Sequence, residues 1–442
     1  MTYGGQACSS TVSQYHSALS IPDNPKYTLV CAGCGSVYFD DRLKCQEDSA
    51  LLRTRYAKRQ IELKDVLGMG KFHDWLPVNE LITSDSGPIT YKCTELAAEL
   101  GLNNLYISFN GYWPERGAFI KTCSFKELEA FPTIQKLKSS GCSLVLASAG
   151  NTARAFAHVA AQTGVKVYIV VPESGISRMW LPEEPTDAIH LIQMGKNCDY
   201  TDSIHLAERL ASLPGMRAEG GARNVARRDG MGTVMLDAAL YMGRTPDHYF
   251  QAIGSGTGGI ASWEASLRLL EDGRFGSVLP KLHLAQNLPF APMYHAWKAG
   301  RREIIQDIDM PDPKKLIHEM YADILSNREP PYSIGGGVYD ALRSTDGIMY
   351  GITNSEAKSA QHLFERYEGI DIFPPAGVAV ASLMEAVNNQ KVDAEEHILL
   401  NITGGGVKRL EMDYSPHKIE PAAYAENAHV PLDEIIHKKV LA

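Results

Sequence analysis

Residues 143–171 read SLVLASAGNTARAFAHVAAQTGVKVYIVV, and this stretch decides the fold. It begins with an apolar run at 143–148, continues with an alanine-rich segment at 151–164 and ends with a second apolar run at 165–171. Short apolar runs bounded by turn residues are typical of strands buried on both faces, and the segment between them suits a helix. The order strand, helix, strand predicts a parallel sheet with helices on its faces.

The same order returns on both sides of this stretch. Residues 93–102 fit a helix that ends at a glycine, and residues 104–109 fit a short strand. Residues 248–286 again read as strand, helix and strand, and a last strand runs into three glycines within 397–406. A chain of 442 residues is long enough for two domains and a large core. We therefore expect two α/β domains, each built on a parallel sheet.

The composition excludes several classes of protein. The chain is 44% apolar and 21% charged, which is typical of a soluble globular enzyme, and its apolar runs are too short to span a membrane. Residues 1–26 are polar and do not have the pattern of a secretory signal, so we expect a flexible extension and a cytoplasmic protein. The net charge of −9 argues against a nucleic-acid partner, but small anionic substrates need only a local positive pocket.

Residues 27–50 form a candidate metal-binding hairpin. They read as a strand, a Cys-x-x-Cys knuckle, a second strand and one more cysteine, which resembles half of a zinc ribbon. The candidate zinc ligands are Cys31, Cys34 and Cys45. A closed structural site needs four ligands, and the residue three positions after Cys45 is Asp48 rather than Cys or His. Either Asp48 completes a zinc site, or the hairpin carries thiols without a metal.

A glycine-rich turn, GSGTGG at 254–259, follows one strand and precedes a helix. Glycines at this place let backbone N–H groups surround a phosphate at the helix N-terminus, where the helix dipole also favours an anion. The turn does not have the Lys-Ser/Thr pair of a P-loop or the acidic residue of a dinucleotide site. It fits a single phosphate, unless it is a tight turn without a ligand. The candidate residues are Gly254, Ser255, Gly256, Thr257, Gly258 and Gly259.

Three further residues have both a structural and a chemical interpretation. Asn151 follows the strand-to-helix turn, where it either caps its own helix or donates a hydrogen bond to a bound oxyanion. Thr403 stands where a strand runs into glycines, at the end of a sheet strand where ligands bind. Lys126 is either a solvated lysine near the start of a surface helix or a lysine that forms a Schiff base with a cofactor.

The series formed by Lys126, Asn151, the turn at 254–259 and Thr403 resembles the tryptophan-synthase-like, fold type II pyridoxal-phosphate enzymes. The resemblance implies that Lys126 forms the Schiff base with the cofactor and that Asn151 hydrogen-bonds its phenolate oxygen. It also implies that the glycine turn holds the phosphate and that Thr403 faces the pyridine nitrogen. A hydroxyl at that nitrogen leaves the ring a weaker electron sink, which favours elimination and replacement at Cβ over transamination.

Other segments narrow the resemblance to one branch. The cysteine knuckle, FHDWLPV at 72–78 and GGARNVARRDGMGTVMLDAAL at 220–240 are similar to threonine synthases. Around the lysine, however, the chain reads CSFKELE at 123–129, where threonine synthases usually carry Gly-Ser-Phe-Lys-Asp-Arg-Gly. The preceding ISFNGYWPERGAFIKT at 107–122 replaces the usual asparagine-rich stretch. Both departures resemble the cysteate synthases, archaeal paralogues that serve coenzyme M biosynthesis.

The resemblance implies a reaction in which sulfite replaces the phosphate of O-phospho-L-serine, giving L-cysteate and phosphate. Lys126 would remove the α-proton and later return it. Because the leaving group and the nucleophile are both anions, arginines and lysines are expected around them, although each can equally be a solvated surface cation. The expected substrate-binding residues are Arg116, Lys121, Arg223, Asn224, Arg227 and Arg228 for these anions, with Ser148 and Thr152 beside Asn151 for the substrate carboxylate.

Two other functions stay open at this stage. One is a threonine synthase, which acts on O-phosphohomoserine with water. The other is a regulator that binds pyridoxal phosphate or a metal without catalysis. For the domains we expect a small unit at 120–215 inserted between 51–119 and 216–442, with the hairpin in front, and for the assembly a homo-oligomer.

Overall fold

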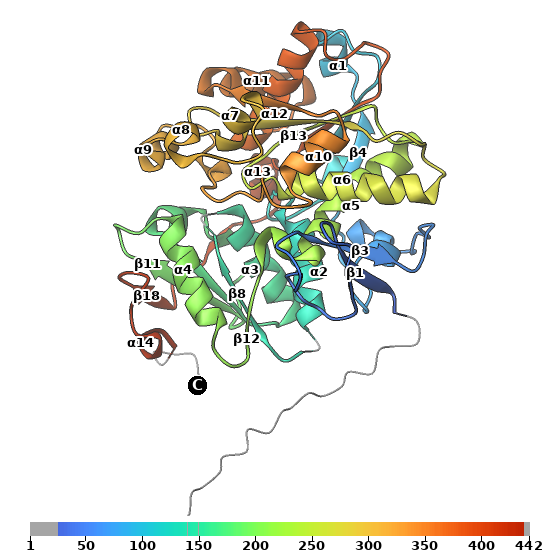
Figure 1. The fold of residues 1–442 in the computed structure, drawn as a ribbon. Helices are drawn as coiled ribbons and strands as arrows, with labels where there is room; N and C mark the ends of the chain where they lie inside the picture. Colours follow the sequence, from blue (N-terminus) through green and yellow to red (C-terminus); the bar gives the residue numbers. More distant parts are fainter. Residues whose placement is uncertain (1–24, 139, 149, 437–442) are drawn as a thin grey trace, which may run out of the picture.

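The computed structural model describes residues 25–138, 140–148 and 150–436. Most of the predicted flexible extension, residues 1–24, lies outside the described residues. The described chain contains two large sheets, each packed with helices, and the small antiparallel sheet that includes β1 (Tyr27–Cys31) and β3 (Leu52–Tyr56) lies beside them (Figure 1).

The larger sheet has six strands in the order β15-β14-β13-β16-β5-β4. Its strands are β4 (Ile89–Lys92), β5 (Leu105–Phe109), β13 (His248–Ala252), β14 (Lys281–Asn287), β15 (Ile348–Ile352) and β16 (Ile398–Ile402). All neighbours pair in parallel except β4, which runs antiparallel to β5. The register places Tyr249 of β13 between Leu282 and Leu399 of its two neighbours.

The smaller sheet has five strands in the order β12-β8-β9-β11-β18, all parallel. They are β8 (Ser143–Ala147), β9 (Val167–Val171), β11 (Ile189–Met194), β12 (Met216–Ala218) and β18 (Ala423–Ala425). The strand-helix-strand order read from 143–171 is therefore confirmed. The two outer strands, β12 and β18, come from the segment that the sequence analysis assigned to the larger domain, and the domain boundaries stay a prediction.

Three small antiparallel sheets contain the remaining strands. The N-terminal hairpin pairs β1 (Tyr27–Cys31) with β2 (Val37–Tyr38) and with β3 (Leu52–Tyr56). Elsewhere β6 (Tyr112–Trp113) pairs with β7 (Ala118–Phe119), and β10 (Trp180–Leu181) pairs with β17 (His417–Lys418).

Helices follow most of the strands. The α-helices are α1 (Glu95–Glu99), α2 (Lys126–Leu137), α3 (Asn151–Thr163), α4 (Tyr200–Ala211), α5 (Val225–Met242), α6 (Thr257–Asp272), α7 (Pro292–Lys298), α8 (Gln306–Asp309), α9 (Pro313–His318), α10 (Val338–Ser344), α11 (Asn354–Glu368), α12 (Pro374–Asn388), α13 (Val407–Asp413) and α14 (Leu432–Ile436). The 3-10 helices are η1 (Gly68–Trp75), η2 (Pro114–Arg116), η3 (Glu173–Arg178), η4 (Gly221–Arg223) and η5 (Asp323–Leu325). Within the described residues, none of these helices has both the length and the apolar character of a membrane span.

Both sheets bury side chains on both faces, because successive strand residues point in opposite directions. In β13, Tyr249 belongs to the core that contains α5 and α6, whereas Phe250 belongs to the core that contains α12. In β8, Leu144 joins the first of these cores, and Val145 packs in a third cluster with α4. One hydrophobic core therefore connects the two sheets.

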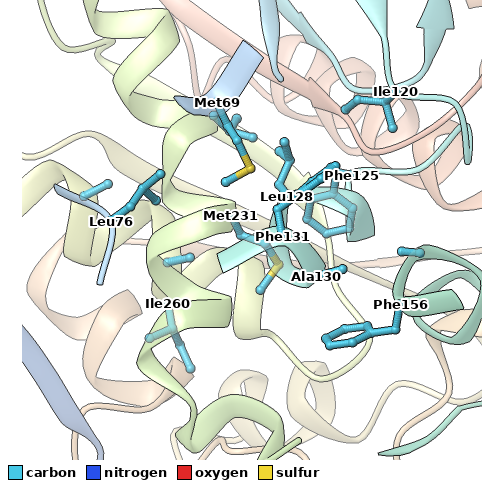
Figure 2. Close-up of a cluster of buried hydrophobic side chains, with 14 of the residues drawn as sticks. Met69, Leu76, Ile120, Phe125, Leu128, Ala130, Phe131, Phe156, Met231 and Ile260 are labelled. Atoms are coloured by element: carbon cyan, nitrogen blue, oxygen red, sulfur yellow. The ribbon is translucent and has the colours of Figure 1, made fainter. Parts of the chain in front are cut away.

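Helices α2, α3 and α5 form the centre of this shared core. Figure 2 shows Leu128 and Phe131 of α2 with Met231 of α5 and Phe156 of α3. The two helices α2 and α5 come very close, since a Cβ atom on Gly230 of α5 would lie 2.0 Å from the backbone oxygen of Leu128. This contact fixes α2, and thus the residue at its first position, against the larger sheet.

Candidate active site

A cavity of about 1320 Å³ lies where strands from both sheets end. Ser148 follows β8 of the smaller sheet, Ile253 follows β13 of the larger sheet and Thr403 follows β16, and all three line the cavity. The carboxyl ends of parallel strands are the usual place for a ligand, because the following loops leave backbone groups and side chains free to contact it. Lys126, at the first position of α2, lines the same cavity.

Backbone hydrogen bonds join the Lys126 loop to the glycine turn after β16. The N–H of Phe125 donates to the carbonyl of Thr403 over 3.1 Å, and the N–H of Gly405 donates to the carbonyl of Cys123 over 3.0 Å. Cys123 has a φ of 54°, an uncommon conformation for a residue with a side chain. These bonds place Lys126 and Thr403, which are far apart in sequence, on one wall of the cavity.

Glu127 holds the same loop from the inside. Its buried carboxylate accepts hydrogen bonds from the N–H of Thr122 at 2.8 Å, from the hydroxyl of Thr122 at 2.6 Å and from the hydroxyl of Ser86. A buried charge requires such partners, because an unpaired carboxylate in the interior is costly. Glu127 therefore stabilises the turn that leads into Lys126.

The amine of Lys126 lies in a largely buried environment. Its Nζ is 3.5 Å from Oε2 of Glu129, one turn further along α2. Burial lowers the pKa of Lys126 below its ordinary value; Glu129 works against this shift, and the charge of Arg227 adds to it. A lysine with a lowered pKa carries more free amine at neutral pH, which is the form that attacks an aldehyde.

We expect the lowered pKa of Lys126 to determine how the rate of cofactor attachment depends on pH. After pyridoxal phosphate is removed, the rate of its reattachment should rise with pH through a midpoint below that of Nα-acetyl-lysine measured in parallel. The sign follows because the folded protein loses the amine proton at a lower pH. A midpoint at or above the ordinary lysine value of about 10.4 would contradict the environment described.

Glu129 belongs to a buried network of charges that sequence reasoning missed. Its Oε1 accepts from Nη2 of Arg227 at 2.7 Å and from the hydroxyl of Thr152 at 3.1 Å. Nη1 of Arg227 lies 2.6 Å from Oε1 of Glu219. Burial tends to raise the pKa of Glu129, but Arg227 and Lys126 outweigh it and hold that pKa below its usual range. Burial raises the pKa of Glu219, and Arg227 offsets this only in part. In the sequence, only the i, i+3 spacing of Lys126 and Glu129 indicates that these two side chains could meet on one face of a helix.

Asn151 is oriented by a second arginine that was also missed. Nη2 of Arg154 donates to Oδ1 of Asn151 over 2.9 Å, and the same guanidinium donates twice to the carbonyl of Thr122. Because a guanidinium can only donate, the amide oxygen must face Arg154 and Nδ2 remains as a donor at the cavity. The alternative role as a cap is not seen, since Gly150 is the N-cap of α3.

The glycine turn forms the start of α6 at the cavity. Gly254, Ser255, Thr257 and Gly258 line the cavity with Gly256, whereas Gly259 is not among the lining residues. The hydroxyls of Ser255 and Thr257 are 2.8 Å apart. The first N–H groups of this 16-residue helix have no partner within the helix, and two hydroxyls stand beside them. This donor set fits one phosphate.

We expect Gly256→Ala to weaken the binding of pyridoxal phosphate by about tenfold or more, because an added Cβ would displace the turn that holds the phosphate, and a loss of about 1.4 kcal/mol in binding free energy is tenfold in affinity. Gly256 has a φ of +82°, and a Cβ there would lie 2.3 Å from Cγ2 of Val338, so the turn must also move. Gly273 ends the same helix with the same φ of +82° but faces open space. Gly273→Ala is therefore the matched control, and titration of both variants with the cofactor should show the loss only for Gly256→Ala.

The predicted substrate residues fall into two groups. Ser148, Thr152, Arg223 and Arg227 line the cavity. The hydroxyl of Ser148 already accepts from the N–H groups of Gly150 and Ala153, so it shapes the start of α3.

Arg116, Lys121, Asn224 and Arg228 are not among the described residues that line the cavity, and their part in substrate binding stays a prediction. Each has another partner. The guanidinium of Arg116 stacks 4.2 Å over the Tyr91 ring, Lys121 pairs with Glu183 at 2.8 Å, Asn224 caps α5 through the N–H of Ala226, and Arg228 is buried against Glu264 at 2.9 Å. For Arg116, Lys121 and Arg228 the partner is an aromatic or acidic side chain from another segment, whereas Asn224 serves its own helix. The cavity instead gains five unpredicted cations: Lys44, Arg178, Lys196, Lys314 and Arg328.

The three candidate metal ligands come together with Asp48. The ligand atoms of Cys31, Cys34, Cys45 and Asp48 all lie within 4.8 Å of one another. The cluster is compatible with a zinc site that Asp48 completes.

Comparison with known proteins agrees with this geometry. The family model described as "Pyridoxal-phosphate dependent enzyme" matches residues 91–404. A protein named cysteate synthase from Methanosarcina acetivorans is 63% identical over 412 residues, which cover 93% of this chain and 99% of that protein. The chain belongs to the cysteate synthase family. Another member, from Methanoculleus marisnigri, is 52% identical over 399 residues and covers 90% of this chain and 92% of its own length.

Solved structures outside the cysteate synthase family share its fold. Maize serine racemase superposes with a TM-score of 0.54 at 15% identity, covering 74% of this chain and 91% of the racemase. A pyridoxal 5'-phosphate-dependent aspartate racemase superposes with a TM-score of 0.53 at 16% identity, covering 72% of this chain and 90% of that racemase. At these identities the likeness concerns the fold alone. The expected fold type II architecture and the family read from CSFKELE and GYWPERGA are both confirmed.

Proposed function

We propose that this chain replaces the phosphate of O-phospho-L-serine with sulfite, giving L-cysteate and phosphate, as a step of coenzyme M biosynthesis. One observation carries the proposal: this chain is 63% identical to a cysteate synthase over 93% of its length, and its cavity holds a partly buried lysine and a helix start that fits one phosphate. Cytoplasmic location and assembly into a homo-oligomer stay predictions.

The residues present fit pyridoxal phosphate. Lys126 would carry its aldehyde carbon as a Schiff base, Nδ2 of Asn151 would donate to its phenolate oxygen, and the first turn of α6 would hold its phosphate. The hydroxyl of Thr403 would face its pyridine nitrogen. When bound, the cofactor supplies an electron sink that acidifies the α-proton of an amino acid and allows a group on Cβ to leave.

Lys126 is the base in this proposal. With the substrate amino acid bound, Nζ of Lys126 would remove the proton from Cα and later return a proton to the same carbon. Glu129, 3.5 Å from Nζ, favours the protonated amine and so stabilises Lys126 while it holds that proton. Burial acts in the opposite direction, and the two influences keep the amine able both to accept and to donate.

The cations of the cavity would receive the substrate anions. The net reaction breaks the Cβ–O bond to phosphate and forms a Cβ–S bond to sulfite, so one anion leaves and another arrives at the same carbon. Arg227 is shared by Glu129 and Glu219, and the guanidinium of Arg223 donates to the carbonyl of Ser49. Lys44 and Lys196 line the cavity without an acidic partner in the described part of the chain, so their charge is available to phosphate or sulfite.

Release of inorganic phosphate tests the substrate class. We expect phosphate release from O-phospho-L-serine to depend on sulfite, with one cysteate formed for each phosphate. O-phosphohomoserine in water should release little phosphate and no threonine. Sulfite-independent turnover of O-phosphohomoserine to threonine, without cysteate in the first reaction, would replace this proposal with a threonine synthase.

A further inference from the structure

We propose that Cys31, Cys34, Cys45 and Asp48 bind one zinc-type ion, and that this ion holds the loop 39–51 as part of the wall of the active-site cavity. The consequence for substrate binding rests on the proposed function, whereas the metal site and the order of the loop do not.

The arrangement of the four ligand atoms suits a tetrahedral ion. The sulfur atoms of Cys34 and Cys45 are 3.6 Å apart, and Sγ of Cys31 is 3.1 Å from Oδ1 of Asp48. With zinc–sulfur bonds of about 2.3 Å, two sulfurs of a tetrahedral site stand roughly 3.8 Å apart, so small movements would close the site. As the metal binds, the three thiols release their protons to solvent, and the resulting thiolates become the ligands.

Backbone amides already point at two of these sulfur atoms. The N–H of Gly33 donates to Sγ of Cys31 at 3.4 Å, and the N–H of Glu47 donates to Sγ of Cys45 at 3.3 Å. Such bonds stabilise negative charge on sulfur, because the donor offsets the charge of a thiolate. All three cysteines are free thiols, as a metal site requires.

Apart from these ligands, the loop is held by side-chain contacts, among them those of Asp41 with Tyr27 at 3.1 Å and with Lys136 at 2.7 Å. Strand β2 ends at Tyr38 and β3 begins at Leu52. Between them, residues 39–50 make no backbone–backbone hydrogen bonds within the described chain. Cys45 and Asp48 connect the loop to Cys31 and Cys34 at the start of the hairpin. A long segment without secondary structure keeps a fixed shape only if side chains or a metal restrain it.

The same loop reaches the cavity. Leu43, Lys44 and Leu51 line the cavity, and the carbonyl of Ser49 accepts a hydrogen bond from Nη1 of Arg223 at 3.1 Å. Cys31 and Cys45 also pack in one hydrophobic cluster with Val225, the first residue of α5. An ion at the cluster would therefore fix both the apolar wall at Leu43 and the position of the Lys44 charge.

The test begins with metal content. The full chain is expressed in zinc-supplemented medium, purified under reducing conditions, and its zinc is measured by mass spectrometry. We expect about one zinc per chain in the wild type and in the control Cys142→Ser, which changes a thiol outside the cluster, and a loss of zinc in Cys34→Ser and Cys45→Ser. A wild type without zinc, a Cys34–Cys45 disulfide in its place, or variants that keep the metal would overturn the site.

A chelator then tests the coupling in the wild-type protein itself. Removal of zinc should make trypsin cut after Arg42 or Lys44, and it should raise the KM for O-phospho-L-serine about fivefold or more with little change in kcat. Returning zinc should reverse both changes. Zinc loss that alters neither the tryptic cut nor KM would refute the coupling. Zinc content and cleavage need no substrate, so failure of the proposed reaction would be seen separately.

Discussion

Lys126→Ala should abolish turnover and the visible absorption of the bound cofactor. Lys126 is the first residue of α2 and lines the cavity. In the proposed reaction its side chain would both attach the cofactor and move the α-proton. Loss of a positioned acid–base group alone costs about 10²–10⁴-fold in rate, and loss of the attachment adds to it. We therefore expect the rate to fall by at least about 10³-fold.

The matched control is Lys138→Ala. Lys138 follows the other end of the same helix, is exposed and lies 3.4 Å from Glu80. This variant should keep the absorption band and its turnover. Steady-state cysteate formation and the absorption spectrum of both variants measure the difference. Near-normal turnover in Lys126→Ala would remove the lysine from the mechanism.

Glu129→Gln should lower the free energy of unfolding by about 3 kcal/mol. Breaking a buried ion pair costs about 3–5 kcal/mol, because the remaining charge stays buried without its partner. We expect the lower end of this range, because Arg227 keeps Glu219 at 2.6 Å. Denaturant unfolding of both proteins at saturating cofactor measures the difference.

Glu80→Gln is the control for this effect. Glu80 contacts Gln135 of α2 and Lys138 just after the helix, but it is exposed, so its loss should cost less than about 1 kcal/mol. A loss for Glu129→Gln no larger than that of the control would show that the buried network does not stabilise the fold.

The stability difference should also depend on pH. Because the folded protein holds the pKa of Glu129 below its ordinary value, its contribution is fully present above the unfolded pKa of about 4.3 and disappears as the pH falls through the folded-state pKa. The gap between wild type and Glu129→Gln should therefore be widest near neutral pH and close on acidification. A gap that widens as the pH falls would mean that Glu129 is protonated in the folded protein.

Much of the fold follows from local sequence patterns. The apolar runs at 143–148 and 165–171 became β8 and β9, because strands buried on both faces need continuous apolar side chains. The outer strands β12 and β18 have three residues each and carry no such pattern. Their place in the smaller sheet depends on pairing partners far away in the chain, which periodicity does not reveal.

The candidate site was only partly predictable for the same reason. The glycine turn and Asn151 stand at strand-to-helix junctions, which sequence patterns locate well. Arg227 and Glu129 meet across 98 residues through the packing of α5 on α2, which no local pattern indicates. Arg116 and Lys121 precede Lys126 in sequence, but sequence does not give the direction of a side chain, and neither residue lines the cavity.

Isotope analysis of the product tests the central claim most directly. The protein is supplied with O-phospho-L-serine and ³⁴S-labelled sulfite in heavy water, and the amino-acid product is examined by mass spectrometry. We predict cysteate that carries the labelled sulfur and deuterium on Cα, because a solvent-exchanged proton returns from Lys126 to that carbon. Cysteate without deuterium on Cα, or no cysteate beside threonine formed from O-phosphohomoserine, would contradict replacement at Cβ through this lysine.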